Sequence, residues 1–240
     1  MKIALIGYGK MGRTIGELAL ERGHSIGLTI DIDSAHNLTR ENLERCDVAI
    51  EFTGPESAKN NIIRCFDYGI PVVSGSTGWL HNWEEVIDCC TRNSGSFLYA
   101  SNFSVGVNLF FELNRFLARL MSKQKEYEVT LEEIHHTQKK DAPSGTAITL
   151  ADQVMKEITR KDHWVNRPSQ LPGELSITSK RIDPAPGTHS VKYSSLIDDI
   201  EIIHTAHSRQ GFALGAILAA EYIQDKKGIF NISEVLGIGS

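Results

Sequence analysis

The chain has 240 residues, a length that fits one large domain or two modest ones. It contains 25 Lys and Arg against 30 Asp and Glu, which gives a formal net charge of −5 and argues against the basic surface of a nucleic-acid-binding protein. Hydrophobic residues make up 41% of the chain and charged residues 23%, both ordinary for a globular protein. We therefore expect a folded protein without long disordered segments and without a nucleic-acid partner.

Membrane insertion and secretion are also not expected. No apolar run approaches the roughly 20 residues that a transmembrane helix needs. The first residues join a short apolar run to a Gly-rich turn without a small-residue cleavage pattern, so we expect no signal peptide. The four cysteines contain no CxxC pair, which disfavours a zinc site or a disulfide framework: Cys46, Cys65, Cys89 and Cys90. We expect reduced thiols and a cytoplasmic location.

The first hundred residues alternate between short apolar strands and amphipathic helices. The predicted strands cover residues 2–6, 25–30, 48–52, 70–73 and 97–100. The predicted helices cover residues 11–22, 56–68 and 83–92. This alternation is typical of an open parallel sheet with helices on both faces, so we predict an α/β fold with a Rossmann-like, doubly wound parallel sheet.

The pattern changes after residue 102. Helices are predicted over residues 107–121, 146–160 and 212–224, strands over 127–134, 174–182, 190–196 and 200–206, and a loop over 162–173. Strands that follow one another without helices favour an antiparallel or mixed sheet, and hence a second, α+β domain. We predict a dinucleotide-binding domain of residues 1–104, to which residues 209–240 return, and a substrate-binding domain of residues 105–208.

The turn after the first strand fits the pattern GxGxxG. Its residues are Gly7, Tyr8, Gly9, Lys10, Met11 and Gly12. Glycines at these positions allow a tight turn, close approach of a pyrophosphate and close packing of helix on strand. The pyrophosphate then lies against the free N–H groups of the helix. The alternative is an ordinary glycine turn, but its place between a strand and a helix favours dinucleotide binding.

An acidic residue at the end of the second strand supports this interpretation. Asp31 follows Gly12 by 19 residues, where a carboxylate can accept hydrogen bonds from the adenosine ribose. Ile32 rather than an arginine comes next, so a 2′-phosphate would find no obvious partner. We expect NADH to serve at least as well as NADPH, although Lys10 and Arg13 offer positive charge nearby.

Two further loops follow predicted strands and are expected to border the cofactor. They consist of Gly75, Ser76 and Thr77, and of Ala100, Ser101, Asn102 and Phe103. In open α/β sheets, ligands bind outside the carboxyl ends of the strands. Ordinary turn chemistry explains each loop equally well when it is taken alone.

A polar segment of the second part combines several groups that can carry chemistry. They are His135, His136, Lys139, Ser144, Gly145 and Thr146. The N-terminus of a helix binds anions, lysine adds mobile positive charge, and histidine exchanges a proton near neutral pH. Together with a domain that holds a hydride carrier, these groups indicate a small anionic substrate, such as a carboxylate, that is reduced at a polarised C=C or C=N bond.

Each of these features also has a simpler explanation. The two histidines could form part of a metal site, but the segment offers few further ligands and is cationic. Either histidine could be structural, the lysines could form a solvated surface pair, and Ser144 could merely cap the helix. All of these explanations would have to hold at once, so we favour a catalytic segment and expect no metal.

Residues 135–147, HHTQKKDAPSGTA, resemble the signature of the dihydrodipicolinate reductase family, also called 4-hydroxy-tetrahydrodipicolinate reductases. The family pattern is His-His followed by Lys-x-Asp-Ala-Pro-Ser-Gly-Thr-Ala. Residues 75–78, 102–108 and 208–209 are similar to further family blocks in the same order. The resemblance implies NAD(P)H-dependent reduction of a cyclic imine dicarboxylate to tetrahydrodipicolinate, on the diaminopimelate route to lysine.

The resemblance also implies roles for single residues. His135 would donate the proton, with Lys139 as a second candidate donor. His136 and the amides of Gly145 and Thr146 would bind the carboxylates of the substrate. The Gly-rich turn and the two later loops match the cofactor positions of the family, although this turn is one residue shorter than the common form. Family members are usually homotetramers, joined through the sheet of the second domain.

Two other functions remain open. Another two-domain NAD(P) oxidoreductase, such as an amino-acid or sugar dehydrogenase, would share the Gly-rich turn and Asp31 but would have no need of the His-His segment. A non-catalytic NAD(P)H sensor would bind the dinucleotide without turnover.

Overall fold

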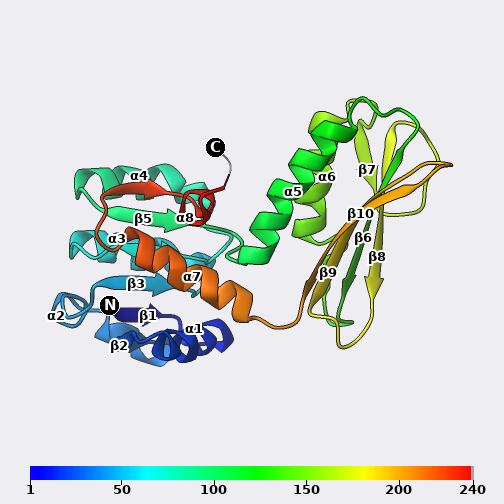
Figure 1. Cartoon of the computed structure of the whole chain (residues 1–240). Coiled ribbons are helices and arrows are strands. Elements are labelled where there is room, and N and C mark those ends of the chain that lie inside the picture. Colours follow the sequence, from blue (N-terminus) through cyan, green and yellow to red (C-terminus); the bar gives the residue numbers. More distant parts are fainter. Residues whose placement is uncertain (239–240) are drawn as a thin grey trace. The chain divides into compact units, whose positions relative to one another are not determined.

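The computed structural model describes residues 1–238, and these residues form two compact units (Figure 1). The first unit consists of Met1–Asn108 and Arg209–Ser240, and the second of Leu109–Ser208. Within the described part of the chain, no helix has both the length and the apolar character needed to cross a membrane. Each unit has its own sheet and its own buried core.

The first unit is built on a six-stranded parallel sheet. Its strands are β1 (Lys2–Ile6), β2 (Ser25–Ile30), β3 (Val48–Glu51), β4 (Val72–Ser74), β5 (Ser96–Tyr99) and β11 (Gly228–Phe230). Their order across the sheet is β11-β5-β4-β3-β1-β2, and all pairs are parallel. β1 and β3 are buried along almost their whole length, which explains their continuous apolar sequences. The doubly wound sheet of the prediction is confirmed.

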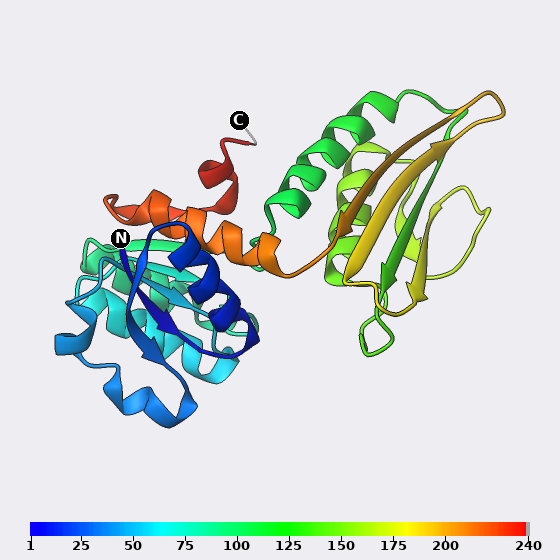
Figure 2. The same ribbon diagram turned by 60° about the horizontal axis from the view of Figure 1, so that its bottom comes forward.

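Helices cover both faces of this sheet (Figure 2). On one face lie α3 (Pro55–Asp67) and α4 (Trp83–Arg92), and on the other α1 (Lys10–Glu21) and α7 (Gln210–Ile223). α7 comes from the C-terminal part of the chain, and Ala216 and Ile217 pack in one core with Ile3 and Leu5 of β1. The last long helix thus returns to the first sheet.

The shortest elements of this unit were not predicted. They are the 3₁₀ helices η1 (Ile32–Asn37) and η2 (Leu80–Asn82), the helices α2 (Arg40–Leu43) and α8 (Ile232–Leu236), and β11. Elements of three to six residues are too short for an apolar period to emerge. β11 forms because it pairs with β5 from far along the chain, which local sequence does not reveal.

The second unit combines two helices with a five-stranded mixed sheet. Its elements are α5 (Val105–Met121, which enters this unit at Leu109), β6 (Glu128–His135), α6 (Gly145–Glu157), β7 (His163–Val165), β8 (Glu174–Arg181), β9 (Gly187–Ser194) and β10 (Asp199–Ala206). The strand order is β10-β9-β6-β8-β7. β9 is antiparallel to β6 and β10, whereas β8 is parallel to β6 and β7.

One prediction for this unit is wrong. Residues 162–173 were expected to form a loop, but His163–Val165 form the edge strand β7, in which Trp164 pairs with Leu175 of β8. Three residues cannot display the alternation that identifies a strand. The strand predicted over residues 190–196 lies at Gly187–Ser194 and begins at a glycine that the apolar pattern does not include.

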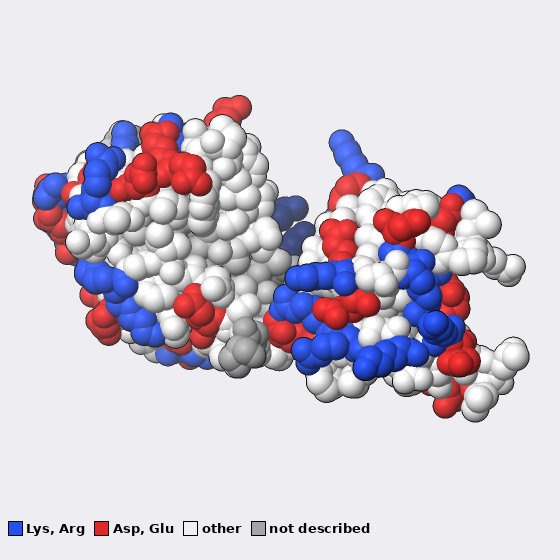
Figure 3. Space-filling model, turned by 90° about the horizontal axis from the view of Figure 1, so that it is seen from above, with Lys and Arg blue, Asp and Glu red and all other residues white. Residues whose placement is uncertain are grey.

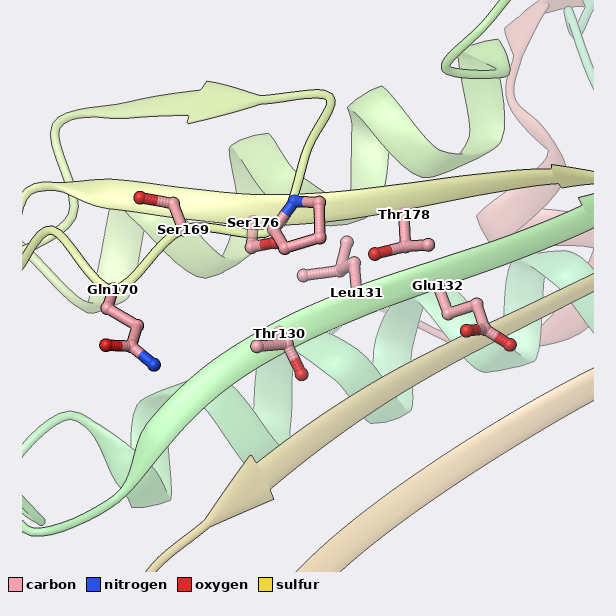
Figure 4. Close-up of a pocket in the computed structure, with 8 residues that line it drawn as sticks. Thr130, Leu131, Glu132, Ser169, Gln170, Ser176 and Thr178 are labelled. Atoms are coloured by element: carbon pink, nitrogen blue, oxygen red, sulfur yellow. The ribbon is translucent and has the colours of Figure 1, made fainter.

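The two faces of this sheet differ. Side chains of β6, β8 and β9 pack with α5 and α6 around Val129, Leu131 and Leu150. On the opposite face, Thr130 and Glu132 of β6 line a cavity of about 530 Å³ (Figure 4). Figure 3 shows Lys and Arg gathered on one side of this unit with acidic residues interspersed, so the charge there is mixed in sign.

Candidate active site

The three glycines of the Gly-rich turn have different surroundings. Gly7 has a φ of +94°, and a Cβ there would lie 2.1 Å from the carbonyl oxygen of Phe52. A Cβ on Gly12 would lie 2.1 Å from the carbonyl oxygen of Gly7. Gly9, in contrast, has open space, because no atom lies within 4 Å of a Cβ built there. Gly7 and Gly12 thus serve the fold, and Gly9 leaves room for a ligand.

This turn lies at the point where the strand order reverses. β1 has β2 on one side and β3 on the other, and the loop after β3 contacts the turn through Phe52. α1 begins directly after Gly9, and no side chain caps its first amides. Open α/β sheets bind ligands at such switch points, and uncapped amides suit the pyrophosphate of a dinucleotide. The residues present therefore fit a dinucleotide.

The other residues of the turn have different surroundings. Lys10 is exposed, and Met11 and Tyr8 pack partly against the core below α1. The guanidinium of Arg13 lies over the ring of Tyr8, 5.4 Å from its centroid. The positive charges of Lys10 and Arg13 thus flank the start of the helix.

Asp31 lies at the end of β2, in the position expected of the ribose-binding acid. Its carboxylate is exposed, and its Oδ1 accepts a hydrogen bond from the amide of Ile32 at 2.9 Å. The hydroxyl of Ser34 accepts a hydrogen bond from the amide of Asp31, which fixes the start of η1. Ile32 is 87% exposed. The segment thus carries two exposed carboxylates, those of Asp31 and Asp33, and no adjacent arginine.

A buried carboxylate organises the loops after β3 and β4. Glu51, at the end of β3, is fully buried. It accepts hydrogen bonds from the amide and hydroxyl of Thr53, from the Ser74 hydroxyl at 2.6 Å and from the Ser76 hydroxyl at 2.8 Å. The side chain of Ser76 is therefore already engaged, and a Cβ on Gly75 would lie 2.2 Å from the ring of Phe52. Exposed Thr77 is the most open position of this predicted cofactor loop. Sequence reasoning missed Glu51, because a carboxylate at the end of an apolar strand has no distinctive pattern.

The loop after β5 also contains both buried and exposed residues. Ala100 and Phe103 are buried in the core beside α7, and Ser101 is exposed. The side-chain oxygen of Asn102 accepts a hydrogen bond from the amide of Ser104 at 2.8 Å. The ring of Phe103 packs 5.7 Å from that of Phe52, so this residue can offer a ligand only its backbone.

In the second unit, His135 lies at the end of β6 and faces the helices. Residues of β6 alternate in burial, so Glu133 and His135 lie on the same side of the strand. The Nδ1 atom of His135 lies 2.5 Å from Oε2 of Glu133, which is fully buried. His189 pairs with Glu133 across β9, and the rings of His189 and His135 are 5.0 Å apart. Two histidines and a carboxylate thus form one buried cluster.

Arg181 connects this cluster to the loop that follows β6. It lies opposite His135 in β8, and its guanidinium donates to Oε1 of Glu133 at 2.9 Å. It also donates to the carbonyl oxygens of Lys139 at 3.3 Å and Asp141 at 2.5 Å. The ammonium of Lys139 contacts both carboxylate oxygens of Asp141 at 2.8 Å. The backbone that carries Lys139 is therefore fixed to the same carboxylate that contacts His135.

The start of α6 adjoins the cluster. The Ser144 hydroxyl accepts a hydrogen bond from the amide of Ala147 at 3.2 Å and lies 3.0 Å from Nε2 of His189. Ser144 therefore acts as the helix cap, while the preceding amides of Gly145 and Thr146 have no hydrogen-bond partner within residues 1–238. A Cβ on Gly145 would meet no atom within 4 Å, so this helix end is open to a ligand.

His136 and His135 differ in setting. His136 is only partly buried and lies just beyond β6, and its carbonyl oxygen accepts a hydrogen bond from the amide of Lys139 at 3.1 Å. The neighbouring Thr137 is held by Asp183 through both its amide and its hydroxyl. His136 and Lys139 thus belong to one turn. His135 and Ser144 do not touch directly, but His189 contacts both of them.

The environment determines the charges of this cluster. Burial alone would raise the pKa of Glu133, but hydrogen bonds from His135, Ser179, Arg181 and Ser144 hold it well below its ordinary value. Burial, together with the positive charge of His135, lowers the pKa of His189 to about 4. Near neutral pH, Glu133 is therefore an anion and His189 is uncharged.

The cluster also resembles a metal site in its donor types. Ligand atoms of Glu133, His135 and His189 lie within 4.8 Å of one another. The guanidinium of Arg181, 2.9 Å from Glu133, opposes the binding of a further cation. The sequence did not single out Glu133, His189 or Arg181; for Glu133, the signal was its spacing of two residues from His135 on a strand.

Comparisons with known proteins agree on one family. The family model described as dihydrodipicolinate reductase, N-terminus, matches residues 1–103, and the one described as dihydrodipicolinate reductase, C-terminus, matches residues 106–236. A 4-hydroxy-tetrahydrodipicolinate reductase of Christiangramia forsetii is 50% identical over 236 residues, covering 98% of both chains. One of Methanosarcina acetivorans is 35% identical, covering 98% of this chain and 89% of its own.

A solved structure shows the same fold. The dipicolinate-bound dihydrodipicolinate reductase from Paenisporosarcina sp. TG-14 superimposes with a TM-score of 0.79 at 21% identity, covering 98% of each chain. The two family models together cover nearly all of the chain, and the relatives match it over almost its full length. The chain therefore belongs to the dihydrodipicolinate reductase family.

Proposed function

We propose that this protein reduces a dihydrodipicolinate-type cyclic imine dicarboxylate, with or without its 4-hydroxyl, to tetrahydrodipicolinate, in the diaminopimelate route to lysine. The observation that carries the proposal is the cluster on β6 and α6. It combines a histidine that contacts a buried carboxylate with an open helix N-terminus and a nearby lysine. These are the groups that a reaction needs when it protonates a doubly negative substrate.

The first unit supplies the cofactor site in this proposal. Residues 1–104 and 209–240 form the dinucleotide-binding domain, and the contacts come from residues 7–12, Asp31, residues 75–77 and residues 100–103. The bound nicotinamide supplies a hydride, that is, a hydrogen atom with both electrons of its bond. Asp31 accepts hydrogen bonds from the ribose, and because Ile32 offers no positive charge, NADH is used at least as well as NADPH.

The second unit, residues 105–208, binds the substrate. His136 and the amides of Gly145 and Thr146 hold its carboxylates, and Ser144 keeps those amides in place by capping α6. A 4-hydroxyl, where the substrate carries one, leaves as water before the hydride adds, which forms the C=C bond conjugated with the imine. His135 gives its proton to the electron-rich atom that remains after hydride has added to the ring carbon conjugated with the imine. Lys139 is the second candidate donor, and its positive charge offsets the charge of the substrate.

We further propose a cytoplasmic homotetramer joined through the sheet of the second domain. One face of this sheet packs on α5 and α6, whereas Thr130, Ile203 and the hairpin tip at Leu196 are exposed. Exposed apolar side chains on a sheet suit an interface between copies. All four cysteines are free and buried, which suits a reducing compartment.

A single assay distinguishes this function from the alternatives. Dihydrodipicolinate is generated freshly by its synthase, and the oxidation of NADH and of NADPH is followed at 340 nm. We expect one nicotinamide oxidised for each substrate consumed. Turnover of amino acids or sugars instead would indicate another oxidoreductase. Binding of NADH without oxidation of it in the presence of any of these compounds would indicate a sensor.

A further inference from the structure

Within the proposed function, the cluster on β6 raises the question of what holds the proton donor. The proposed role of His135 requires one ring nitrogen to be fixed and the other to face the substrate. We propose that Glu133 is the positioning residue of the reaction, which binds Nδ1 of His135 and leaves Nε2 as the atom that donates the proton.

The carboxylate of Glu133 is held at both oxygens. Oε1 accepts hydrogen bonds from Arg181 at 2.9 Å and from the amide of Ser144 at 3.3 Å. Oε2 faces Nδ1 of His135 at 2.5 Å. Because Glu133 is fully buried and Oε1 accepts two hydrogen bonds, its carboxylate cannot rotate without losing them. The ring of His135 is thus positioned by a residue of its own strand rather than by the loop that follows β6.

The other nitrogen of His135 lies where a small residue leaves space. A Cβ on Gly187, at the start of β9, would lie 3.1 Å from Nε2 of His135. Any other residue at position 187 would therefore crowd the nitrogen that is left free by Glu133. Glu133 thus contacts Nδ1 of the ring, and Gly187 leaves space beside Nε2.

Charged groups surround the ring of His135. The groups nearby are anionic Glu133, cationic Arg181, uncharged His189, Lys139 and, beyond His189, His204. Arg181 pairs with Glu133, and the Glu133 carboxylate is the charged group in direct contact with the ring of His135. An anion at Nδ1 stabilises the imidazolium that must exist before the proton is transferred.

The test compares Glu133→Gln with Glu132→Gln. Glu132 is the adjacent residue of β6, but it faces the opposite side of the sheet and pairs with Lys180. In the reductase assay with NADH, we expect Glu133→Gln to lower kcat by about 10²-fold, at the lower end of what general acid catalysis contributes. The KM for NADH should stay unchanged. Glu132→Gln should behave as the wild type.

The pH profile distinguishes positioning from general support of the fold. Because Glu133→Gln removes the anion beside Nδ1 of His135, the alkaline fall of kcat should move to lower pH in this variant. Glu133→Asp keeps the charge, and its profile should stay close to that of the wild type even if kcat falls. In the His135→Gln background, Glu133→Gln should cause little further loss, because the two side chains act as one unit.

Several outcomes would overturn the assignment. The first is a wild-type kcat and pH profile in Glu133→Gln. The second is a fall in kcat on Glu133→Gln that is equally large in the wild-type and His135→Gln backgrounds. The third is a loss of activity with EDTA that zinc restores, since the cluster would then be a metal site. Glu133→Asp keeps the test valid if Glu133→Gln fails to fold. If the wild type itself does not oxidise NADH with the substrate, the proposed function fails, whereas an active wild type with an unaffected variant contradicts only the role of Glu133.

Discussion

Gly12 lies so close to the carbonyl oxygen of Gly7 that a Cβ on it would be 2.1 Å away, whereas Gly9, between them, has no neighbour within 4 Å of such a Cβ. One motif thus contains a glycine that the fold requires and a glycine on which no packing contact depends. The dinucleotide interpretation of this turn therefore makes opposite predictions for the two positions.

We expect Gly9→Ala to leave the thermal stability of the protein unchanged and to raise the KM for NADH at least tenfold. Its φ of −75° is accessible to alanine, and the added methyl group occupies only the space left for the pyrophosphate. Gly12→Ala should instead lower the stability by a few kcal/mol, as overpacking does. Thermal unfolding and cofactor titration measure the two effects. Equal stability losses in both variants would contradict the division of roles.

The second prediction concerns cofactor preference. Asp31 offers a carboxylate, and exposed Ile32 offers no charge, so kcat/KM with NADH should equal or exceed that with NADPH. Ile32→Arg should raise kcat/KM for NADPH several-fold, because a guanidinium can pair with the 2′-phosphate. A wild type that strongly prefers NADPH would show that Lys10 or Arg13 outweighs Asp31.

The third prediction concerns the proton donor. His135→Gln should lower kcat by 10²-fold or more, as is usual for loss of a general acid, with a much smaller effect on KM. His163→Gln is the matched control, since His163 is an exposed histidine of the same unit. Near-normal turnover in His135→Gln would refute the role of this residue. Lys139→Ala separates donation from binding: a donor lowers kcat, whereas a binding group raises KM.

The fourth prediction concerns pH and stability. The pKa of His189 falls from its ordinary value of about 6.5 to about 4 in the folded protein, because burial opposes the charged form. The unfolded chain therefore takes up a proton below pH 6.5 that the folded chain does not, and folding loses stability as the pH falls. Between pH 6.5 and 5 the wild type should lose about 2 kcal/mol more than His189→Gln. Urea unfolding at several pH values measures this difference, and parallel curves would contradict it.

The sequence predicted those features that repeat along the chain. The buried strands of the first sheet and the amphipathic α1, α3 and α4 have periods that a short window reveals. The edge strands β7 and β11 do not, because three residues show no period and their pairing depends on distant strands. Motifs likewise singled out His135, Lys139 and the start of α6 as candidate site residues, whose function the proposed experiments test.

The partners of these residues could not be read from the sequence, because register brings them together. His189 lies opposite Glu133 only through the antiparallel pairing of β9 with β6, and Arg181 opposite His135 only through the parallel pairing of β8. Glu51 depends on the same kind of long-range packing, since Ser74 and Ser76 reach it from the next strand. Local sequence specifies the elements, and tertiary pairing completes the site.

The central claim is that the hydride carrier and the proton donor act on the same bound molecule. A crystal structure of the protein with NAD⁺ and pyridine-2,6-dicarboxylate tests it most directly. We expect one dicarboxylate held by the amides of Gly145 and Thr146, with C4 of the nicotinamide and Nε2 of His135 both within about 4 Å of its ring. A dicarboxylate that binds away from His135, or a nicotinamide that does not reach it, would contradict the proposed reduction.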